Sequence, residues 1–462
     1  MTGHEAGPES REALREDLYR RFSEGGLRRS RRARALRGML WFMAIRVAPG
    51  LKRALDFVVA LVLLAALSPL MVLVAGWLLA SKGKALERTP VMGRWCVVFD
   101  RLRFAAPDKG WLARTGLRGT PVLLNILRGE MSGVGPRGLA PGEMSPRDRE
   151  ARKRYNVRPG VVSLWWLRQR ANIAYEREAS LDAEYVESQS LKGDLGIALR
   201  AVPAMLVGHG VATAPDEVEA LGVRMHNVTM AEAVEQICGW AGADQPRQVC
   251  FVNADCLNIS RRDEDYKAVL NRADMTLADG IGVRLAGKIL GWDIRQNVNG
   301  TDLFPRLCDA LAAAGRSVFL LGARPGVAER VAAWMARREP AARVAGTRHG
   351  YFSEDEEAAV AEEIARSNAD VLLVALGAPR QDKWIARRLK DTGVKVAMGV
   401  GGLFDFYSGR VARAPVWMRE LGLEWFFRFL QEPGRMWKRY FVGNVVFLWR
   451  VGWERLRRRP AG

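Results

Sequence analysis

The sequence has few of the residues that build metal sites and disulfide frameworks. It contains five cysteines and four histidines among 462 residues. The cysteines show no CxxC spacing and are odd in number, which excludes a disulfide framework and a cysteine-zinc site and fits a reducing compartment. The histidines show no paired ligand spacing. We therefore expect no metal site and no cofactor.

Acidic residues are also outnumbered, by 71 Lys and Arg to 51 Asp and Glu, which gives a net charge of +20. Nothing resembles a zinc finger or an aromatic RNA-recognition signature, so nucleic acid is supported by charge alone and we do not expect it as a partner. Arginines cluster between Arg28 and Arg37, and basic residues from Val411 onward alternate with tryptophans such as Trp425 and Trp449. Basic residues beside tryptophans favour an anionic membrane surface as partner, with a solvated basic face as the alternative.

Long apolar runs are absent except for residues 54–80, in which Asp56 is the single charge. That run gives about 40 Å of helix, enough to span a bilayer. More than fifty residues precede it, so it is not a signal peptide. Ser68-Pro69 in the middle predicts a kink. A straight crossing and a re-entrant hairpin both remain open, but basic residues on both flanks favour the hairpin, with both flanks cytoplasmic.

Residues 216–410 alternate short apolar runs, glycines and helical patterns. Four apolar runs are expected to be strands: Val249–Val252, which precedes a helical stretch, and Val318–Leu321, Val371–Leu376 and Val394–Val400, which end at glycines. Helices are expected at 327–338 and up to residue 388. This order predicts an α/β fold, a Rossmann-like parallel sheet with helices on both faces. Ligands of such sheets bind beyond the carboxyl ends of the strands.

Polar clusters follow these expected strands. They are Asn253-Ala254-Asp255, Leu277–Gly282, Asn299–Asp302 and Gly377–Asp382. Taken singly, each is better explained as a helix cap or a turn; together at strand ends they predict a pocket. Glycine permits close approach of a ligand, so Asp279 can face that pocket. Gly280-Ile281-Gly282 lacks the third glycine of a dinucleotide fingerprint, which argues against NAD.

Two resemblances give these motifs a function. Leu51–Asp56, the apolar helix, Leu124–Arg137, Arg158–Gly160 and Asp182–Tyr185 resemble the monotopic bacterial sugar transferases, which move a phosphosugar to polyprenol phosphate and have a re-entrant helix. The adjacent Asp-Glu pair of that family is replaced by Arg118 and Gly119, which supply neither a carboxylate nucleophile nor a metal ligand. We expect a membrane platform without phosphotransfer activity.

From Phe251 to Tyr440 a series of motifs closely resembles the WecG/TagA/CpsF glycosyltransferases. The resemblance implies inverting transfer from a UDP-sugar to a polyprenyl-diphosphate-linked acceptor, without a tightly bound metal. It implies Asp279 as general base. Phe251 stands where the family often has a threonine. The expected substrate-binding residues are Asn253, Asn299, Thr301, Asp302, Gly377, Gln381, Arg413, Arg419 and Arg428. The three arginines are candidates to neutralise the leaving diphosphate, with interfacial lipid contact as the alternative.

The expected organisation is a basic N-terminal segment (1–50), a sugar-transferase-like domain (51–207) with membrane helix 54–80, a linker (208–219), a glycosyltransferase domain (220–410) and a basic, tryptophan-rich membrane-proximal appendage (411–462). We expect an enzyme of exopolysaccharide or other cell-surface glycan synthesis at the cytoplasmic face of a bacterial inner membrane. A bifunctional enzyme and a noncatalytic scaffold are the alternatives. The donor sugar, the acceptor sugar and the oligomeric state, including a homo-oligomer, are left open.

Overall fold

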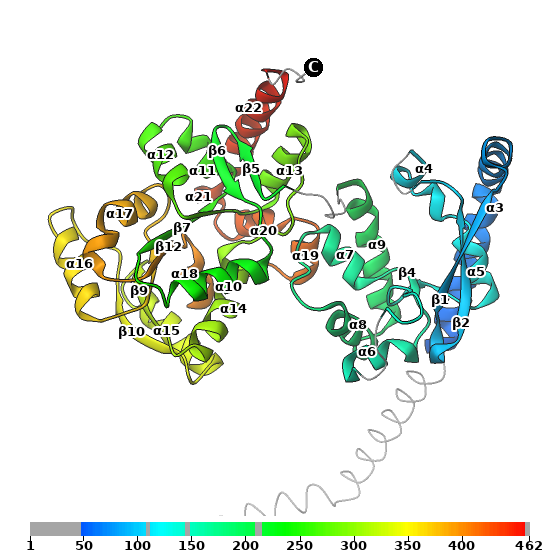
Figure 1. The fold of residues 1–462 in the computed structure, drawn as a ribbon, viewed down its shortest axis with the longest axis horizontal. Coiled ribbons are helices and arrows are strands. Elements are labelled where there is room, and N and C mark those ends of the chain that lie inside the picture. The colour runs from blue at the N-terminus through cyan, green and yellow to red at the C-terminus, as the bar shows by residue number, and fades with distance from the viewer. Residues whose placement is uncertain (1–47, 108–110, 144–147, 208–214, 458–462) are drawn as a thin grey trace, which may run out of the picture. The chain divides into compact units, whose positions relative to one another are not determined.

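The computed structural model describes residues 48–107, 111–143, 148–207 and 215–457. The N-terminal arginine cluster and most of the expected linker lie outside these ranges. The chain divides into two compact units (Figure 1). Among the described residues, the first unit contains those up to Leu164 and Glu178–Ala198, and the second contains Trp165–Arg177 and those from Leu199 onward. The short stretch Trp165–Arg177 therefore packs with the second unit, although it lies within the sugar-transferase-like half of the sequence.

The first unit begins with the long apolar helix α3 (Ala48–Lys82). By length and composition it is able to cross a membrane. It is one helix across Ser68-Pro69, without a loop between two halves. Pro69 has no N–H to donate to the carbonyl of Ala65, and the Ser68 hydroxyl donates to that carbonyl instead, at 2.9 Å. If α3 returns to the membrane face from which it enters, it therefore does so by a bend at Pro69 and not by a loop between two helices.

Both ends of α3 pack on the same folded unit. Near the start, Asp56 accepts hydrogen bonds from the hydroxyl of Ser132 and the N–H of Gly133, at 2.6 and 3.0 Å. Near the end, Leu78 is fully buried in a cluster that includes Phe104. Side chains on the other faces of α3 stay exposed; they include Val62, Val72 and Leu73. The helix thus presents apolar surface over its length while its two ends stay attached to one unit.

The rest of the first unit is small. Strands β1 (Leu86–Met92) and β2 (Val98–Phe104) form an antiparallel pair, and β3 (Ser132–Val134) pairs with β4 (Gly160–Val162) in parallel. Short helices complete the unit: α4 (Trp111–Arg114), η3 (Leu117–Gly119), α5 (Val122–Arg128), α6 (Arg149–Lys153), η4 (Arg154–Asn156), α8 (Glu178–Glu187) and the start of α9 (Leu191–Val207). The stretch α7 (Leu164–Arg170) leads into the second unit.

The second unit is built on an eight-stranded sheet with the strand order β10-β9-β11-β12-β7-β8-β6-β5. The strands are β5 (Glu217–Ala220), β6 (Val223–His226), β7 (Arg247–Val252), β8 (Met275–Ala278), β9 (Ser317–Gly322), β10 (Arg343–Arg348), β11 (Val371–Ala375) and β12 (Val396–Gly399). All neighbours are parallel except β5 and β6. The predicted α/β parallel sheet is confirmed, and the consecutive strands β8 and β9 lie on opposite sides of the β12-β7 pair.

Helices cover both faces of this sheet, because alternate side chains of β7 are buried on opposite faces. Val249 and Phe251 pack into one core with α10 (Met230–Trp240), α14 (Gly300–Ala313), α15 (Val327–Arg338) and α18 (Leu403–Tyr407). Cys250 and Val252 face the other side, where α11 (Ala254–Ser260), α12 (Glu264–Arg272) and α13 (Ile281–Leu290) pack. Helices α16 (Glu357–Arg366) and α17 (Arg380–Arg388) cover the same side farther along the sheet. Residues i and i+2 of a strand face the same side, so Val249 and Phe251 belong to one core and Cys250 and Val252 to the other.

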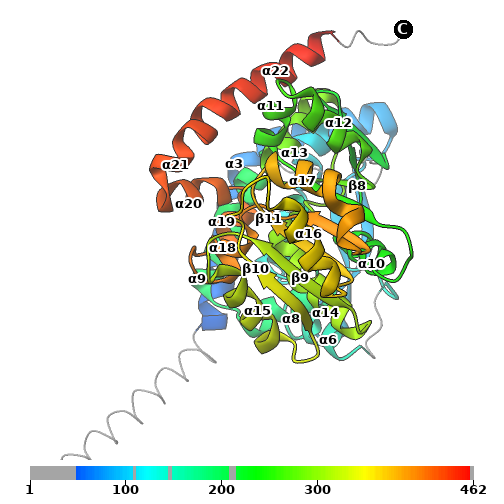
Figure 2. The ribbon, with the colours of Figure 1, turned by 90° about the vertical axis from the view of Figure 1, so that its left-hand side faces the viewer.

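The expected appendage is helical. It comprises α19 (Val416–Glu420), α20 (Glu424–Gln431), α21 (Pro433–Trp437), the π-helical turn η6 (Lys438–Val442) and α22 (Gly443–Arg457). Figure 2 shows α20, α21 and α22 as a continuous arm along one side of the second unit. Phe447 and Val451 bury α22 against the core that contains α11 and α13. The outer side of the arm exposes Trp449 and Trp453, whose rings stack with centroids 6.2 Å apart.

Candidate functional site

A pocket of about 1150 Å³ lies at the carboxyl ends of the central strands of the second unit. Residues that directly follow β7, β8, β9, β11 and β12 line it, together with residues of the appendage. Most of the predicted site residues line this one pocket, namely Asn253, Asp279, Asn299, Thr301, Asp302, Gly377, Gln381, Arg419 and Arg428. Arg413 is not among the lining residues, but it contacts Asp302 behind the wall.

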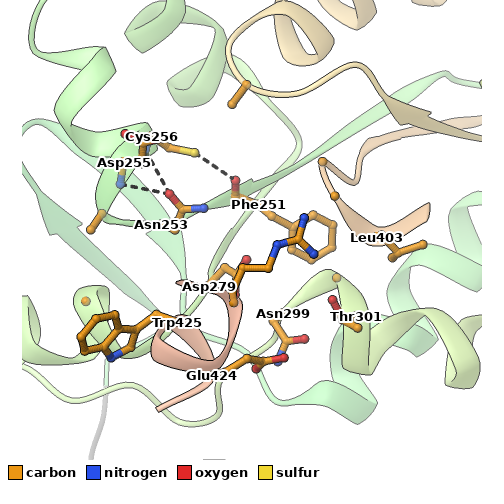
Figure 3. A pocket seen from close by; sticks show the side chains of 18 of the residues that line it. Phe251, Asn253, Asp255, Cys256, Asp279, Asn299, Thr301, Leu403, Glu424 and Trp425 are labelled. Carbon is orange, nitrogen blue, oxygen red and sulfur yellow. Dashed lines mark hydrogen bonds between the residues drawn. The ribbon is translucent and has the colours of Figure 1, made fainter. Parts of the chain in front are cut away.

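Asp279 stands at the end of β8, where the chain turns into α13. Its backbone N–H donates to the carbonyl of Val252 at 2.8 Å, which extends the strand pairing by one residue. Gly280 follows with φ +88°, a conformation that a side chain would strain, and its N–H donates to Oδ1 of Asn297 at 2.7 Å. These contacts place the Asp279 carboxylate in the pocket near Asn253, Asn299 and Glu424 (Figure 3).

The electrostatics of the pocket favour a proton on Asp279. Burial raises the pKa of its carboxyl from 3.8 to about 7, and the nearby carboxylate of Glu424 adds to this shift, while Arg439 and Arg413 oppose it. A carboxylate with a pKa near 7 is a stronger base than an ordinary aspartate and is still largely ionised at slightly alkaline pH. It is suited to accept a proton from a substrate hydroxyl.

Asn253 caps α11 and lines the pocket at the same time. Its Oδ1 accepts hydrogen bonds from the N–H groups of Asp255 and Cys256, at 3.0 and 3.1 Å (Figure 3). The capping interpretation considered from the sequence is therefore correct for the carbonyl oxygen. Because the cap fixes the orientation of the amide, the NH2 group of Asn253 is the part that a bound ligand can use.

Asn299 and Asp302 form a buried pair at the start of α14. Asn299 caps the helix by accepting from the N–H of Asp302 at 2.8 Å, and its NH2 group donates to Oδ2 of Asp302 at 2.8 Å. The other carboxylate oxygen of Asp302 lies 2.7 Å from Arg413 and 3.1 Å from Arg419. Burial would raise the pKa of Asp302, but the two guanidinium groups and Asn299 hold it below its usual range. Asp302 is thus an anion that anchors the appendage.

The three predicted arginines are each held by carboxylates. Arg413 also approaches Glu424 at 3.5 Å. Arg428 lies 3.1 Å from Glu432 and 3.7 Å from Asp405. Its Nη1 is buried without a hydrogen-bond acceptor among the described residues. Carboxylates therefore orient these side chains while leaving cationic donors at the pocket wall, an arrangement that suits a diphosphate.

Gln381 joins two loops of the pocket floor. Its side chain is buried, and Oε1 accepts from the N–H of Gly377 at 3.1 Å and from that of Gly401 at 2.9 Å. Gly377 follows β11 with φ +81°, and Gly401 follows β12 with φ +55°. The Gln381 side chain therefore fixes the relative position of the loops after these strands, and its carbonyl oxygen is not free for a substrate.

The structure adds pocket residues that sequence reasoning did not select. Glu424 begins α20 and has a raised pKa, mainly because of burial, although Arg413 opposes the shift. Arg439 lies 3.1 Å from Asp255, and both side chains line the pocket. Glu424 belongs to a motif that supported the family resemblance, but no sequence pattern places it near Asp279, because the two residues are far apart in the sequence.

The first unit lacks the acid pair of active sugar transferases at the expected positions. Arg118 and Gly119 belong to η3, and Nη2 of Arg118 lies 3.3 Å from a carboxylate oxygen of Glu87 on β1. Across the described ranges, no group of three or more His, Cys, Asp or Glu residues is arranged to hold a metal ion. A cation from Arg118 thus occupies the position where the resemblance would place a carboxylate.

Comparison with known proteins finds two families along the chain. Residues 218–461 match the family described as "Glycosyl transferase WecG/TagA/CpsF family", and residues 107–208 match "Bacterial sugar transferase". A Bacillus subtilis (strain 168) protein named N-acetylglucosaminyldiphosphoundecaprenol N-acetyl-beta-D-mannosaminyltransferase is 36% identical over 191 residues, which are 41% of this chain and 73% of the relative.

A Staphylococcus aureus (strain MRSA252) protein of the same name is 31% identical over 241 residues, which are 51% of this chain and 92% of the relative. The match to the family covers more than half of the sequence and contains the whole sheet of the second unit, except for the first residue of β5, together with the appendage. The chain therefore belongs to the WecG/TagA/CpsF family and is a glycosyltransferase that also carries a bacterial sugar-transferase region.

Proposed function

We propose that this protein transfers an N-acetylhexosamine, with N-acetylmannosamine as the first candidate, from a UDP-sugar to a polyprenyl-diphosphate-linked N-acetylglucosamine. The names of the relatives in Bacillus and Staphylococcus supply the acceptor and the sugar. The observation that carries the proposal is the Asp279 carboxylate, which has a pKa of about 7 in a pocket with arginines on its wall.

The reaction is a single displacement at the anomeric carbon. The acceptor hydroxyl oxygen attacks this carbon and forms the new C–O bond, while the bond from the anomeric carbon to the UDP oxygen breaks. The hydroxyl proton passes to Asp279, and the bonding electrons leave with UDP. Attack from the face opposite to UDP inverts the configuration. Arg419 and Arg428 would stabilise the negative charge that develops on the diphosphate.

The reaction would take place at a membrane surface. The apolar faces of α3 and the exposed Trp449 and Trp453 of α22 support this assignment. Because both ends of α3 pack on the same folded unit, we infer that both flanks of the helix lie on one side of the membrane. That side is the cytoplasmic face, where nucleotide sugars are made. The product would be a lipid-linked intermediate of exopolysaccharide or another cell-surface glycan.

A transfer assay with the purified full chain tests this function. The wild-type protein should convert polyprenyl-diphosphate-N-acetylglucosamine to a disaccharide product with UDP-N-acetylmannosamine in a panel of UDP-sugars, as read by mass spectrometry. Asp279→Asn keeps the size of the side chain but cannot take a proton, so turnover should fall by about 10²–10⁴-fold while UDP-sugar binding persists.

The matched control is Asp244→Asn, an exposed aspartate in the loop before β7. It should leave turnover unchanged. Turnover of Asp279→Asn above about a tenth of the wild-type rate would show that Asp279 is not the base, since general-base catalysis is worth about 10²–10⁴-fold. Absence of product with every UDP-sugar would contradict the function itself.

A further inference from the structure

A segment of the sugar-transferase half is built into the glycosyltransferase unit. Residues 107–208 match the bacterial sugar transferases, yet Trp165–Arg177 packs within the second unit. Ala171, Asn172 and Ile173 line the same pocket as Asp279. The match to the WecG/TagA/CpsF family begins only at residue 218. The pocket therefore contains a piece of chain from outside the region that defines the glycosyltransferase family.

The main docking point of this segment is the loop 294–297, between α13 and α14. The N–H of Asn297 donates to the carbonyl of Asn172 at 2.9 Å, and the hydroxyl of Tyr175 donates to the carbonyl of Asn297 at 2.6 Å. The side chain of Asn172 adds a bond to the carbonyl of Ile294 at 2.9 Å. Asn172 has φ +58°, a conformation that asparagine adopts more readily than most residues. Both backbone groups of Asn297 are thus fixed by the segment.

Asn297 passes this restraint to the proposed base. Its side-chain oxygen accepts from the N–H of Gly280 at 2.7 Å, and Gly280 directly follows Asp279. An unbroken series of short hydrogen bonds therefore leads from Tyr175 through Asn297 to the peptide that carries Asp279. A general base works only when its oxygen is within hydrogen-bond reach of the proton, so the orientation of this peptide controls the rate.

Tyr175 also contacts the anchor of the appendage. Its hydroxyl lies 3.2 Å from Oδ2 of Asp302, the residue that pairs with Arg413 and Arg419. Burial and the neighbouring Asp302 raise the pKa of Tyr175 well above its ordinary value, so the hydroxyl remains a donor at any physiological pH. One phenol group thus contacts both the peptide support of the base and the carboxylate that holds the arginines.

The segment and the second-unit part of helix α9 hold the appendage at a second point. Nε of Arg168 lies 3.3 Å from Glu420, and Arg200 pairs with the same carboxylate. Glu420 is buried and lies next to Arg419 at the end of α19. The appendage is therefore fixed to the sugar-transferase half of the sequence as well as to Asp302.

We propose that Tyr175 is a positioning residue for sugar transfer, and that the sugar-transferase region retains the segment 165–177 to complete the glycosyltransferase site. This inference rests on the proposed role of Asp279 as base. Tyr175 itself does not touch the reacting atoms; it acts through Asn297, whose carbonyl oxygen lies 2.6 Å from the hydroxyl, closer than Asp302 at 3.2 Å. The region that lost its own acid pair thus contributes to the chemistry of the second unit.

The test is a double-mutant cycle in the full chain. Tyr175→Phe removes only the hydroxyl, and Asn297→Ala removes the acceptor for Gly280. Each should lower kcat about tenfold, with the KM for the UDP-sugar changed less than about twofold, because positioning affects the transition state more than ground-state binding. The double variant should be no slower than Asn297→Ala alone, since both changes interrupt the same series of hydrogen bonds.

Two further variants separate positioning from stability. Glu176 lies in the same segment and makes an exposed ion pair with Arg306 of α14. Glu176→Gln removes the charge of this pair and should leave kcat unchanged. Asn172→Gly keeps the positive φ but removes the bond to Ile294, so it should lower kcat even if Tyr175→Phe proves too unstable to assay. Thermal unfolding of every variant accompanies the kinetics.

A kcat of Tyr175→Phe equal to that of Glu176→Gln would overturn the inference, as would independent, multiplicative effects of Tyr175→Phe and Asn297→Ala. Either result would leave the proposed function intact, provided that Asp279→Asn is inactive. Conversely, an active Asp279→Asn variant would show that Asp279 is not the base, while the fall in kcat of Tyr175→Phe could still be measured. The two failures are therefore distinguishable.

Discussion

The Asp302 carboxylate lies 2.7 Å from Nη2 of Arg413, so the first turn of α14 is tied to the start of the C-terminal appendage. The same carboxylate oxygen lies 3.1 Å from Arg419. One buried anion therefore holds two cations of the appendage beside the pocket. Sequence reasoning grouped Asp302 with the substrate-binding residues; Asp302 lines the pocket and also binds Arg413 and Arg419.

Replacing Asp302 should separate the appendage from the sheet. Asp302→Asn keeps the shape but removes the charge, and we expect the free energy of unfolding at pH 7.5 to fall by about 2 kcal/mol, because two partly buried guanidinium groups lose their counter-ion. The KM for the lipid-linked acceptor should rise. Urea denaturation and steady-state kinetics measure the two effects.

Asp309→Asn is the control on the same helix, because its pair with Arg338 is exposed and should contribute little. The folded pKa of Asp302 lies below its usual value, so its contribution is present at neutral pH and is lost as the pH falls through that folded value. The difference between wild type and Asp302→Asn should therefore shrink on acidification. A difference that is independent of pH would contradict the ion-pair explanation.

The pKa of Asp279 predicts how activity depends on pH. The base must be ionised, and its folded pKa is about 7, so kcat/KM should decrease as the pH falls below about 7. A profile with an apparent pKa near 4 would show that the environment of the carboxyl differs from the one described. The measurement is kcat/KM between pH 5 and 9 with a fixed lipid acceptor.

The same shift predicts a stability change of opposite sign to that of Asp302. The pKa of Asp279 is raised on folding, so ionisation costs stability as the pH rises from the ordinary value of 3.8 to about 7. Asp279→Asn removes this cost. Relative to wild type, its melting temperature should increase over that range and level off above about pH 7. A variant less stable than wild type at pH 8 would contradict the assignment.

The first unit should not transfer phosphosugars. Arg118 and Gly119 occupy the positions of the expected acid pair, and Arg118 is paired with Glu87. We expect no polyprenyl-diphosphate-sugar product when the full-length Asp279→Asn variant, which blocks the proposed second reaction, is incubated with polyprenyl phosphate, UDP-sugars and Mg²⁺. Formation of UMP with a lipid-linked product would revive the bifunctional alternative.

Sequence patterns predicted the central sheet well, because buried parallel strands are short apolar runs that end at glycines. The helix expected at 327–338 has the observed bounds of α15. Strand β10 was not predicted, since an edge strand with arginine at both ends and partly exposed residues has no apolar run. The polar clusters at strand ends predicted most of the pocket wall, because the carboxyl ends of parallel strands meet at one edge.

Other features depend on contacts between distant residues and have no local signal. Glu424 affects the pKa of Asp279 only because α20 folds back over the sheet. Tyr175 reaches Asn297 only because residues 165–177 leave the first unit and pack on the second. Both residues lie in segments whose local sequence indicates a helix or a loop; tertiary packing alone places Glu424 in the pocket wall and Tyr175 against Asn297 and Asp302.

The two flanks of α3 should be accessible from the same side of the membrane. Gly50 and Gly76 have open space around the position of a Cβ atom, so cysteine fits at both, and Lys84 is exposed after the helix. Gly50→Cys and Lys84→Cys are made in a background with the exposed Cys96 replaced by serine. Both should react with a membrane-impermeant maleimide in inverted vesicles and neither should react in intact cells.

Gly76→Cys is the internal control, because it lies within the apolar run and should be shielded from an aqueous reagent in either preparation. The physical reason for equal sidedness is that Asp56 and Leu78, near opposite ends of α3, are both attached to the same folded unit. A straight crossing would have to detach one end from that unit and expose the buried side chains near it. Labelling of Gly50→Cys and Lys84→Cys from opposite sides would therefore contradict both the packing of α3 and the proposed cytoplasmic location of the active site.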